Sequence, residues 1–148
     1  MAVAELEEFV VKETLSTEDV EKVFWASNSD RYDYFIKRVT RTGFVWGLWE
    51  QEGWLTTTGR DGKERFLVWP DEVFAKRALD ENGASLWPLA IVDRIPVSKW
   101  LTNYLPDIGT FGDKVWVFPA HQLNGGVVVP QDMIRDLKKE IEKQAYSV

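Results

Sequence analysis

Residues 44–69, FVWGLWEQEGWLTTTGRDGKERFLVW, decide the fold class because they predict three consecutive antiparallel strands. The stretch opens with a nearly continuous apolar run, and residues 54–58 are rich in aromatic and β-branched side chains, which favour strands. Asp61-Gly62 is a two-residue hairpin signal, and residues 64–69 return from that turn as the third strand. The middle of the chain is therefore expected to form a sheet.

Cap residues and apolar stripes at helical spacing predict helices on both sides of this stretch. In the helix that precedes it, Tyr32, Phe35, Ile36 and Val39 fall at i, i+3, i+4 and i+7, and Gly43 is expected to end the helix. Helices are predicted over residues 16–26, 27–43, 70–82, 98–105 and from 130 onward, and further strands over 87–92, 115–118 and 127–129, with Pro106 as a helix stop and Pro88 at a strand start.

The resulting order of elements is α-α-β-β-β-α-β-α-β-β-α, which favours an α+β fold. We expect a mixed, largely antiparallel sheet of about five to six strands, flanked by helices, with room for one parallel pair. The length of 148 residues suits a single domain, residues 1–148. Within it, residues 1–15 are a candidate N-terminal extension and residues 16–148 the compact α+β body.

The composition excludes several classes of site. The chain has no cysteine and one histidine, which excludes disulfides, thiolate metal sites, cysteine nucleophiles and histidine-rich metal sites. Neither of the two glycine-rich phosphate-binding motifs occurs, and no Gly-x-Ser-x-Gly elbow is present. No catalytic residue, metal or cofactor is therefore expected, and enzyme activity is the less favoured interpretation.

The net charge of −6 lies entirely in residues 1–30, and the rest of the chain is neutral. A solvated helix face near the terminus explains this asymmetry most simply, and a patch that steers a basic partner is the alternative. The acidic balance argues against nucleic-acid and anionic-membrane partners. Because the chain has neither a basic leader nor an apolar stretch of about 20 residues, we expect a cytoplasmic protein.

The eight tryptophans are the most unusual feature, and four of them fall on or beside the three predicted strands. Because side chains alternate along a strand, both faces of these strands are apolar. Either helices cover both faces and the rings fill the core, or one face exposes an aromatic patch, or its walls hold a flat ligand above Gly47. The candidate ligand- or partner-binding residues are Trp46, Trp49, Trp54, Arg65 and Trp69, with Trp49 and Trp54 expected to be the most exposed.

Other side chains that could carry chemistry also have an ordinary structural explanation. His121 is expected on an exposed loop rather than as a catalytic base. The acid pairs Asp107/Asp113 and Glu50/Glu52 could act as acid and base, but they suit solvated loops equally well. A basic group on the second helix, expected to be a solvated face rather than an anion site, comprises Arg31, Lys37, Arg38 and Arg41.

Short motifs in a particular order resemble a bacterial family catalogued as domain of unknown function 2750. The motifs are RYDYFIKRV at residues 31–39, VWGL at 45–48, LVWP at 67–70, Phe74-Ala75, Ile95-Pro96, Trp100-Leu101, Leu105-Pro106, VWVFP at 115–119 and GVVV at 126–129. The resemblance covers about residues 30–142. The family carries no assigned activity, so the resemblance transfers no catalytic residue. More distantly, the order of elements is similar to the N-terminal domain of SseB-type bacterial proteins.

The expected function is that of a small, cytoplasmic, non-enzymatic protein-interaction domain that contacts another protein. The alternative is a small-molecule binder or weak enzyme with a tryptophan-lined pocket on the first three strands. Binding of single-stranded nucleic acid by stacking on the sheet is a third interpretation, and the lack of a basic groove makes it the least favoured.

Overall fold

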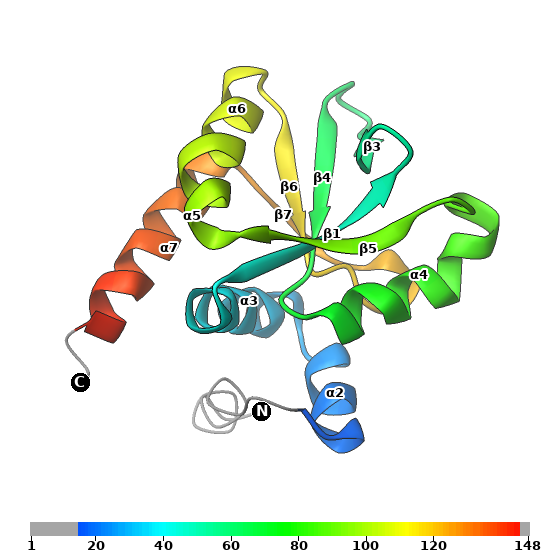
Figure 1. Ribbon diagram of the computed structural model, residues 1–148, viewed down its shortest axis with the longest axis horizontal. Helices are drawn as coiled ribbons and strands as arrows, with labels where there is room; N and C mark the ends of the chain where they lie inside the picture. The colour runs from blue at the N-terminus through cyan, green and yellow to red at the C-terminus, as the bar shows by residue number, and fades with distance from the viewer. Residues whose placement is uncertain (1–14, 146–148) are drawn as a thin grey trace.

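The structure, a computed structural model, describes residues 15–145, apart from the side chains of residues 83–85. Nearly all of the candidate N-terminal extension therefore lies outside the described residues. The helices are α2 (Thr17–Phe24), α3 (Asn28–Thr42), α4 (Glu72–Leu86), α5 (Val97–Lys99), α6 (Leu105–Thr110) and α7 (Pro130–Ala145), with a π-helical segment η1 (Trp100–Tyr104) and a 3₁₀ turn η2 (His121–Leu123) (Figure 1). The strands are β1 (Phe44–Glu50), β2 (Gly53–Trp54), β3 (Thr56–Thr58), β4 (Glu64–Val68), β5 (Ile91–Pro96), β6 (Lys114–Val117) and β7 (Gly126–Val128).

The α+β class and the largely antiparallel pairing are confirmed, but the strands form two sheets. One sheet has the order β2-β1-β5 and the other β3-β4-β6-β7, in which only the β4–β6 pair is parallel. The predicted strand over residues 54–58 divides at Leu55, because its first part pairs with β1 and its second part with β4. Trp46 and Trp69 join the sheets by two backbone hydrogen bonds of 2.9 and 2.8 Å.

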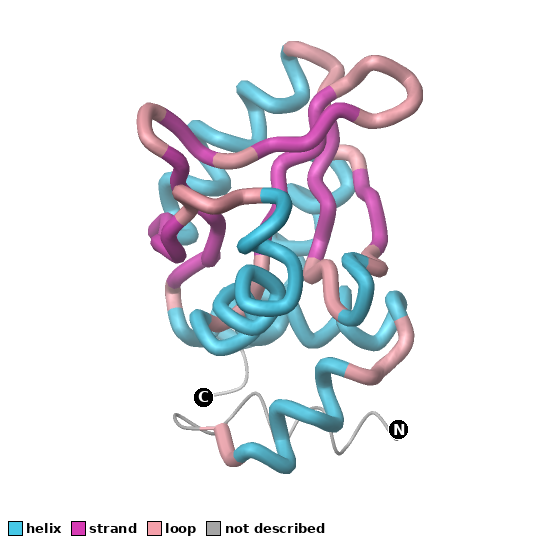
Figure 2. Tube along the Cα trace, turned by 90° about the vertical axis from the view of Figure 1, so that its right-hand side faces the viewer, coloured by secondary structure: helices cyan, strands magenta, loops and turns pink. Residues whose placement is uncertain are grey.

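Helices lie on two sides of these strands. In Figure 1, α5, α6 and α7 lie to the left of β4 and β6, whereas α3 and α4 lie below β1 and β5. Figure 2 shows from the side that α2 forms the bottom of the molecule, away from the strands. No helix within residues 15–145 is long and apolar enough to cross a membrane.

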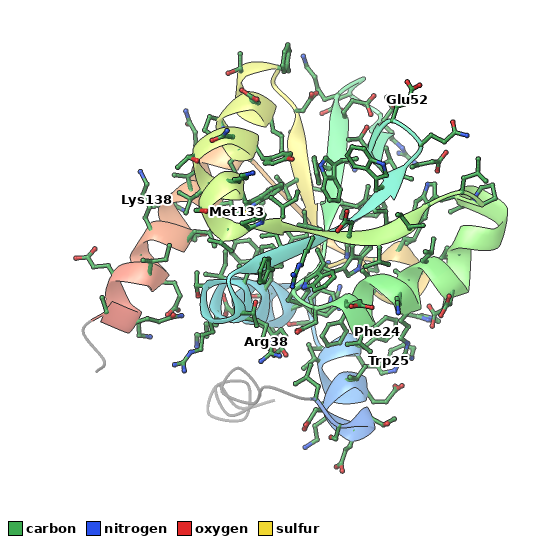
Figure 3. The ribbon with its side chains drawn as sticks, in the orientation of Figure 1. Phe24, Trp25, Arg38, Glu52, Met133 and Lys138 are labelled. Carbon is green, nitrogen blue, oxygen red and sulfur yellow. The ribbon has the colours of Figure 1, made fainter. Side chains whose placement is uncertain are left out.

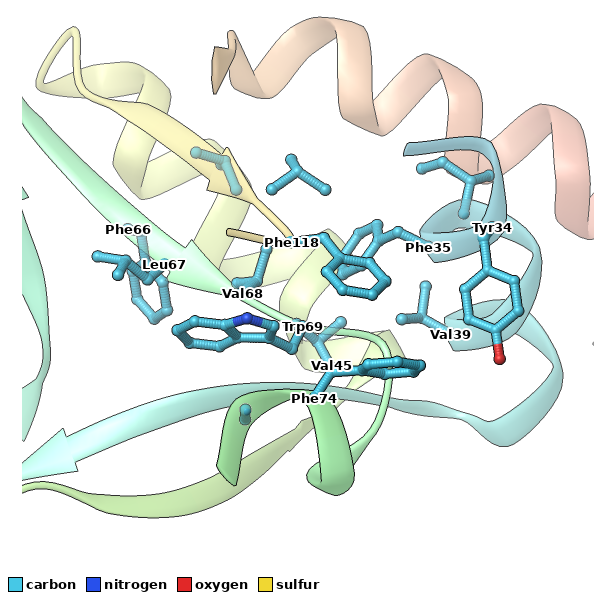
Figure 4. Close-up of a cluster of buried hydrophobic side chains, with 14 of the residues drawn as sticks. Tyr34, Phe35, Val39, Val45, Phe66, Leu67, Val68, Trp69, Phe74 and Phe118 are labelled. Atoms are coloured by element: carbon cyan, nitrogen blue, oxygen red, sulfur yellow. The ribbon is translucent and has the colours of Figure 1, made fainter. Parts of the chain in front are cut away.

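The core lies where the two sheets meet α3 and α4. Figure 4 shows rings from distant parts of the chain packed together there. Tyr34 meets Phe74 with ring centroids 6.1 Å apart, and Phe74 meets Phe118 at 4.7 Å. The fully buried aromatic side chains are Phe24, Tyr34, Phe35, Trp69, Phe74, Trp100 and Phe118. The core is therefore aromatic, which accounts for part of the tryptophan content.

The predicted end of α3 is confirmed, because Gly43 adopts the left-handed conformation, with φ of 86°. Pro106, by contrast, does not stop a helix. The N–H of Leu105 bonds the carbonyl of Trp100, five residues back, so the π-helical turn widens the backbone just before the proline ring. The chain then continues through Pro106 into α6.

Two further boundaries differ from the predictions. Helix α4 continues past residue 82 to Leu86, and the side chain of Asn82 donates to the Ala78 carbonyl within the helix. Strand β5 begins at Ile91 rather than at residue 87, since the pairing with β1 starts there, opposite Trp49. Residues 87–90 therefore lie outside the sheet, and the apolar side chain of Leu89 is exposed on the surface.

Candidate functional site

The five predicted site residues do not gather in one place. Trp69 is fully buried, and its indole Nε1 donates to the Pro119 carbonyl at 2.8 Å, so it belongs to the core. Trp46 is half-buried and points to the opposite face of β1 from Trp49. Arg65 likewise points to the opposite face of β4 from Phe66, which contacts Trp54. Only Trp49 and Trp54 lie together.

Trp49 and Trp54 are register partners at the β1–β2 turn, and their rings meet edge to face with centroids 5.2 Å apart. A Cβ at Gly47 would lie 3.2 Å from the Trp54 ring. The indole itself therefore occupies the space above Gly47 that the sequence suggested for a flat ligand. The inner edge of Trp54 is fixed as well, because its Nε1 donates to the Tyr104 hydroxyl at 3.2 Å.

Both tryptophans remain half-buried, and a cleft opens beside Trp54. Its volume is about 420 Å³, and it is lined by Glu50, Gln51, Glu52, Gly53, Trp54, Leu55, Thr56 and Trp87. The lining contains two carboxylates and no basic side chain. Glu52 points outward at the upper right of Figure 3. The cleft thus combines two indole rings with an acidic rim.

Exposed apolar side chains flank Trp87, which lines this cleft. Leu86, Leu89 and Ile91 are 54%, 58% and 58% exposed. Ile91 is the register partner of Trp49, and Trp87 lies between Leu86 and Leu89 in the chain. We call this group the β5 apolar surface, and its members are Trp49, Trp54, Leu86, Trp87, Leu89 and Ile91.

Sequence reasoning missed four members of this surface. Residues 87–92 looked like a strand, in which apolar side chains are ordinarily covered on at least one face. Pro88 was the available signal, because a proline at this position keeps the preceding residues out of a central strand. The loop that results leaves Leu89 exposed, next to Leu86 at the end of α4, which is exposed as well.

The predicted basic face on α3 is only partly solvated, because Arg31 and Arg38 are each 4% exposed. The guanidinium of Arg38 pairs with Asp71 at 3.1 Å. Arg31 donates to the carbonyls of Phe118 and Asn124, at 3.3 and 2.6 Å, and also to the Ala26 carbonyl and the Asn28 side chain. Burial lowers the pKa of Arg31. These two arginines hold elements together and are not an anion site.

Arg31 fixes a backbone segment with unusual dihedral angles. Phe118, Gln122 and Leu123 have φ of 51°, 54° and 57°, which residues other than glycine rarely adopt. The segment presents His121 on the surface, as expected, where its ring lies 4.6 Å from that of Trp25. Trp25 is itself exposed beside α2 (Figure 3).

The remaining candidate acids do not assemble a site. One carboxylate oxygen of Asp113 accepts the backbone N–H of Glu64 at 3.0 Å, and Asp107 is exposed on α6. Among residues 15–145, no three histidine, aspartate or glutamate side chains lie close enough to hold a metal ion.

Comparison with known protein families gives a match. The sequence profile of the family described as "Protein of unknown function (DUF2750)" matches residues 32–137. No curated protein matches the chain. The matched range includes both sheets and every residue of the β5 apolar surface.

Proposed function

Because this chain belongs to the DUF2750 family, whose function is unknown, we propose its function from its surface. It is a protein-interaction domain whose β5 apolar surface binds a partner segment that carries both apolar and basic side chains. The observation that carries this proposal is the exposure of Leu86, Leu89 and Ile91 beside the half-buried pair Trp49 and Trp54. Contiguous exposed apolar side chains are typical of contact sites, and tryptophan is enriched among their energetically dominant residues.

The rim of the cleft supports a basic partner. Glu50 and Glu52 extend from the β1–β2 turn next to Trp54, and no basic side chain lines the cleft to neutralise them. Complementary charge at the edge of an apolar contact increases the rate of association and selects the partner. Binding is therefore expected to weaken as the salt concentration rises.

The contact is expected to run through side chains rather than by addition of a strand. β5 is the edge of its sheet and could accept a further strand through its backbone. Asp93 and Arg94 are both exposed in the middle of that edge, however, and charged side chains on an edge strand oppose strand pairing. The apolar group at the start of β5 has no such charges.

A small cationic molecule is the second candidate occupant. The volume of about 420 Å³ lies within the range of ligand pockets, which is roughly 300–1,000 Å³. Trp54 and Trp87 offer ring faces, and Glu50 and Glu52 offer negative charge. Cations are attracted to indole faces, so these groups would act on the same ligand.

Co-purification with a double variant tests the proposal. Leu89→Ser combined with Ile91→Ser removes the centre of the surface, and Val73→Ser, at an exposed apolar position of α4, is the matched control. A stoichiometric partner is expected with the unchanged chain and with the control, and not with the double variant. The absence of any stoichiometric partner, or equal recovery with the double variant, contradicts the proposal.

A further inference from the structure

Arg65 is a half-buried cation, and one of its donor atoms has no acceptor among residues 15–145. Its Nε is buried and has no hydrogen-bond partner within the described part of the chain. Buried donors are almost always paired, so an orphaned N–H on a charged group requires an explanation. Arg65 also lies on the opposite face of β4 from the rings that surround Trp54, and the β5 apolar surface does not use it.

The guanidinium of Arg65 packs against Gly59. A Cβ at position 59 would lie 2.7, 2.8 and 2.9 Å from three atoms of that guanidinium. The backbone of Gly59 does not have a positive φ, so its conformation does not require glycine. A Cβ at this position is compatible with the backbone but would displace the guanidinium of Arg65 from its present place.

A second cationic side chain projects from the strand next to that of Arg65. Lys114 is its register partner across the parallel β4–β6 pair, so both side chains leave the same face near the start of their strands, at the top of Figure 1. Arg60 and Lys63 are exposed on the β3–β4 loop next to them. The Glu64 carboxylate is engaged by the Thr56 and Thr58 hydroxyls, each at 2.7 Å.

The carboxylate of Asp61 lies among these cations. It accepts one hydrogen bond from the Nζ of Lys114 at 3.2 Å and another from the backbone N–H of Lys63 at 3.0 Å. The N–H of Lys63, and next the ammonium of Lys114, hold the pKa of Asp61 below its usual value, and the charge of Arg65 adds to the effect. An anionic oxygen is thus stabilised at this point of the surface.

We propose that Arg65 and Lys114 form a site for the phosphate group of a small molecule, and that Asp61 occupies this site in the free chain. The Asp61 and Lys114 side chains are 39% and 35% exposed, and an ion pair this exposed is weak. A dianionic phosphate displaces the carboxylate at little cost and then meets two cations. Arginine suits phosphate because its planar donors match two oxygens at once.

Titration of the full chain with inorganic phosphate, followed by amide chemical shifts at constant ionic strength, tests this site. The expected result is a saturable change confined to residues 59–65 and 113–114. Asp61→Asn is expected to tighten binding about two- to fivefold, because it removes the competing carboxylate. Arg65→Gln is expected to weaken binding about tenfold or more. A parallel titration with glycerol 3-phosphate distinguishes an ester from free phosphate.

Two further variants keep the test decisive. Gly59→Ala displaces the guanidinium without removing its charge, and is expected to weaken binding even if Arg65→Gln fails to fold. Lys138→Gln, at an exposed position of α7, is the control for general attraction of anions. The absence of a saturable change up to about 50 mM phosphate overturns the proposal. An unchanged affinity in Asp61→Asn, or equal weakening in Lys138→Gln, overturns it as well.

Discussion

The indole of Trp54 lies on the backbone of Gly47, so that a Cβ at position 47 would be 3.2 and 3.3 Å from two ring carbons and 3.5 Å from the Leu67 carbonyl. Gly47 therefore sets the position of a ring that lines the candidate cleft and contacts the aromatic core. The candidate site and the core depend on the same side chain.

Gly47→Ala is expected to destabilise the fold by about 1–3 kcal/mol, because the added methyl forces Trp54 off its neighbours. Urea unfolding followed by tryptophan fluorescence measures the change. Gly53→Ala is the matched control, since a Cβ there meets nothing within 4 Å. Equal stability of the two variants would show that the packing of Trp54 on Gly47 does not matter.

Arg31→Met is expected to cost about 3 kcal/mol, because it leaves the buried Phe118 carbonyl without its donor and removes one of the two donors to the Asn124 carbonyl. Hydrogen exchange of residues 118–124 should accelerate more than that of the rest of the chain. Arg41→Met, at an exposed position of the same helix, should change neither property. A uniform change in exchange over the whole chain would contradict the role of Arg31 in fixing residues 118–124.

Tyr34→Phe is expected to leave stability at pH 7 unchanged or slightly higher, because the buried hydroxyl has no partner in the described structure. Burial raises the pKa of Tyr34. Tyrosine in the unfolded chain has a pKa of about 10. Below that pH the burial of neutral Tyr34 leaves the free energy of unfolding unaffected by titration, and above it the unfolded chain ionises first, so the free energy of unfolding falls as the pH rises.

Urea titrations at pH 7 and above pH 10 check this dependence on pH. The variant should lose less stability than the unchanged chain on the alkaline side. Tyr32→Phe is the contrast, since its hydroxyl donates to Asp136 at 2.6 Å, and it should lose about 1 kcal/mol at pH 7. A loss of that size in Tyr34→Phe would indicate an unseen partner for its hydroxyl.

Local chemistry explains which parts of the fold were predictable. Gly43 ends α3, and a turn that contains Asp61 and Gly62 joins β3 and β4, because both features depend on a few neighbouring residues. The turn spans residues 59–63, however, rather than the two residues that the hairpin signal predicted. The division of residues 54–58 between two sheets depends on partners far along the chain, which periodicity does not report. Pro106 was misjudged for a related reason, since the π-helical turn before it is not visible as a pattern.

The candidate site was predictable only in part. The pair Trp49 and Trp54 follows from two aromatic residues on either side of a tight turn. The burial of Arg31 does not, because a basic residue on a helix is ordinarily solvated, and its carbonyl acceptors come from residues 26, 118 and 124. Exposure of Leu89 and Ile91 depends equally on which elements fail to cover them.

A photo-crosslinking residue at position 89 tests the proposed interaction most directly, with the same residue at position 73 as the reference. The interaction proposal predicts one dominant protein adduct at position 89 in cells, absent at position 73 and reduced when Glu50 and Glu52 are both changed to Gln. The same adducts at both positions, or none at position 89, would contradict it.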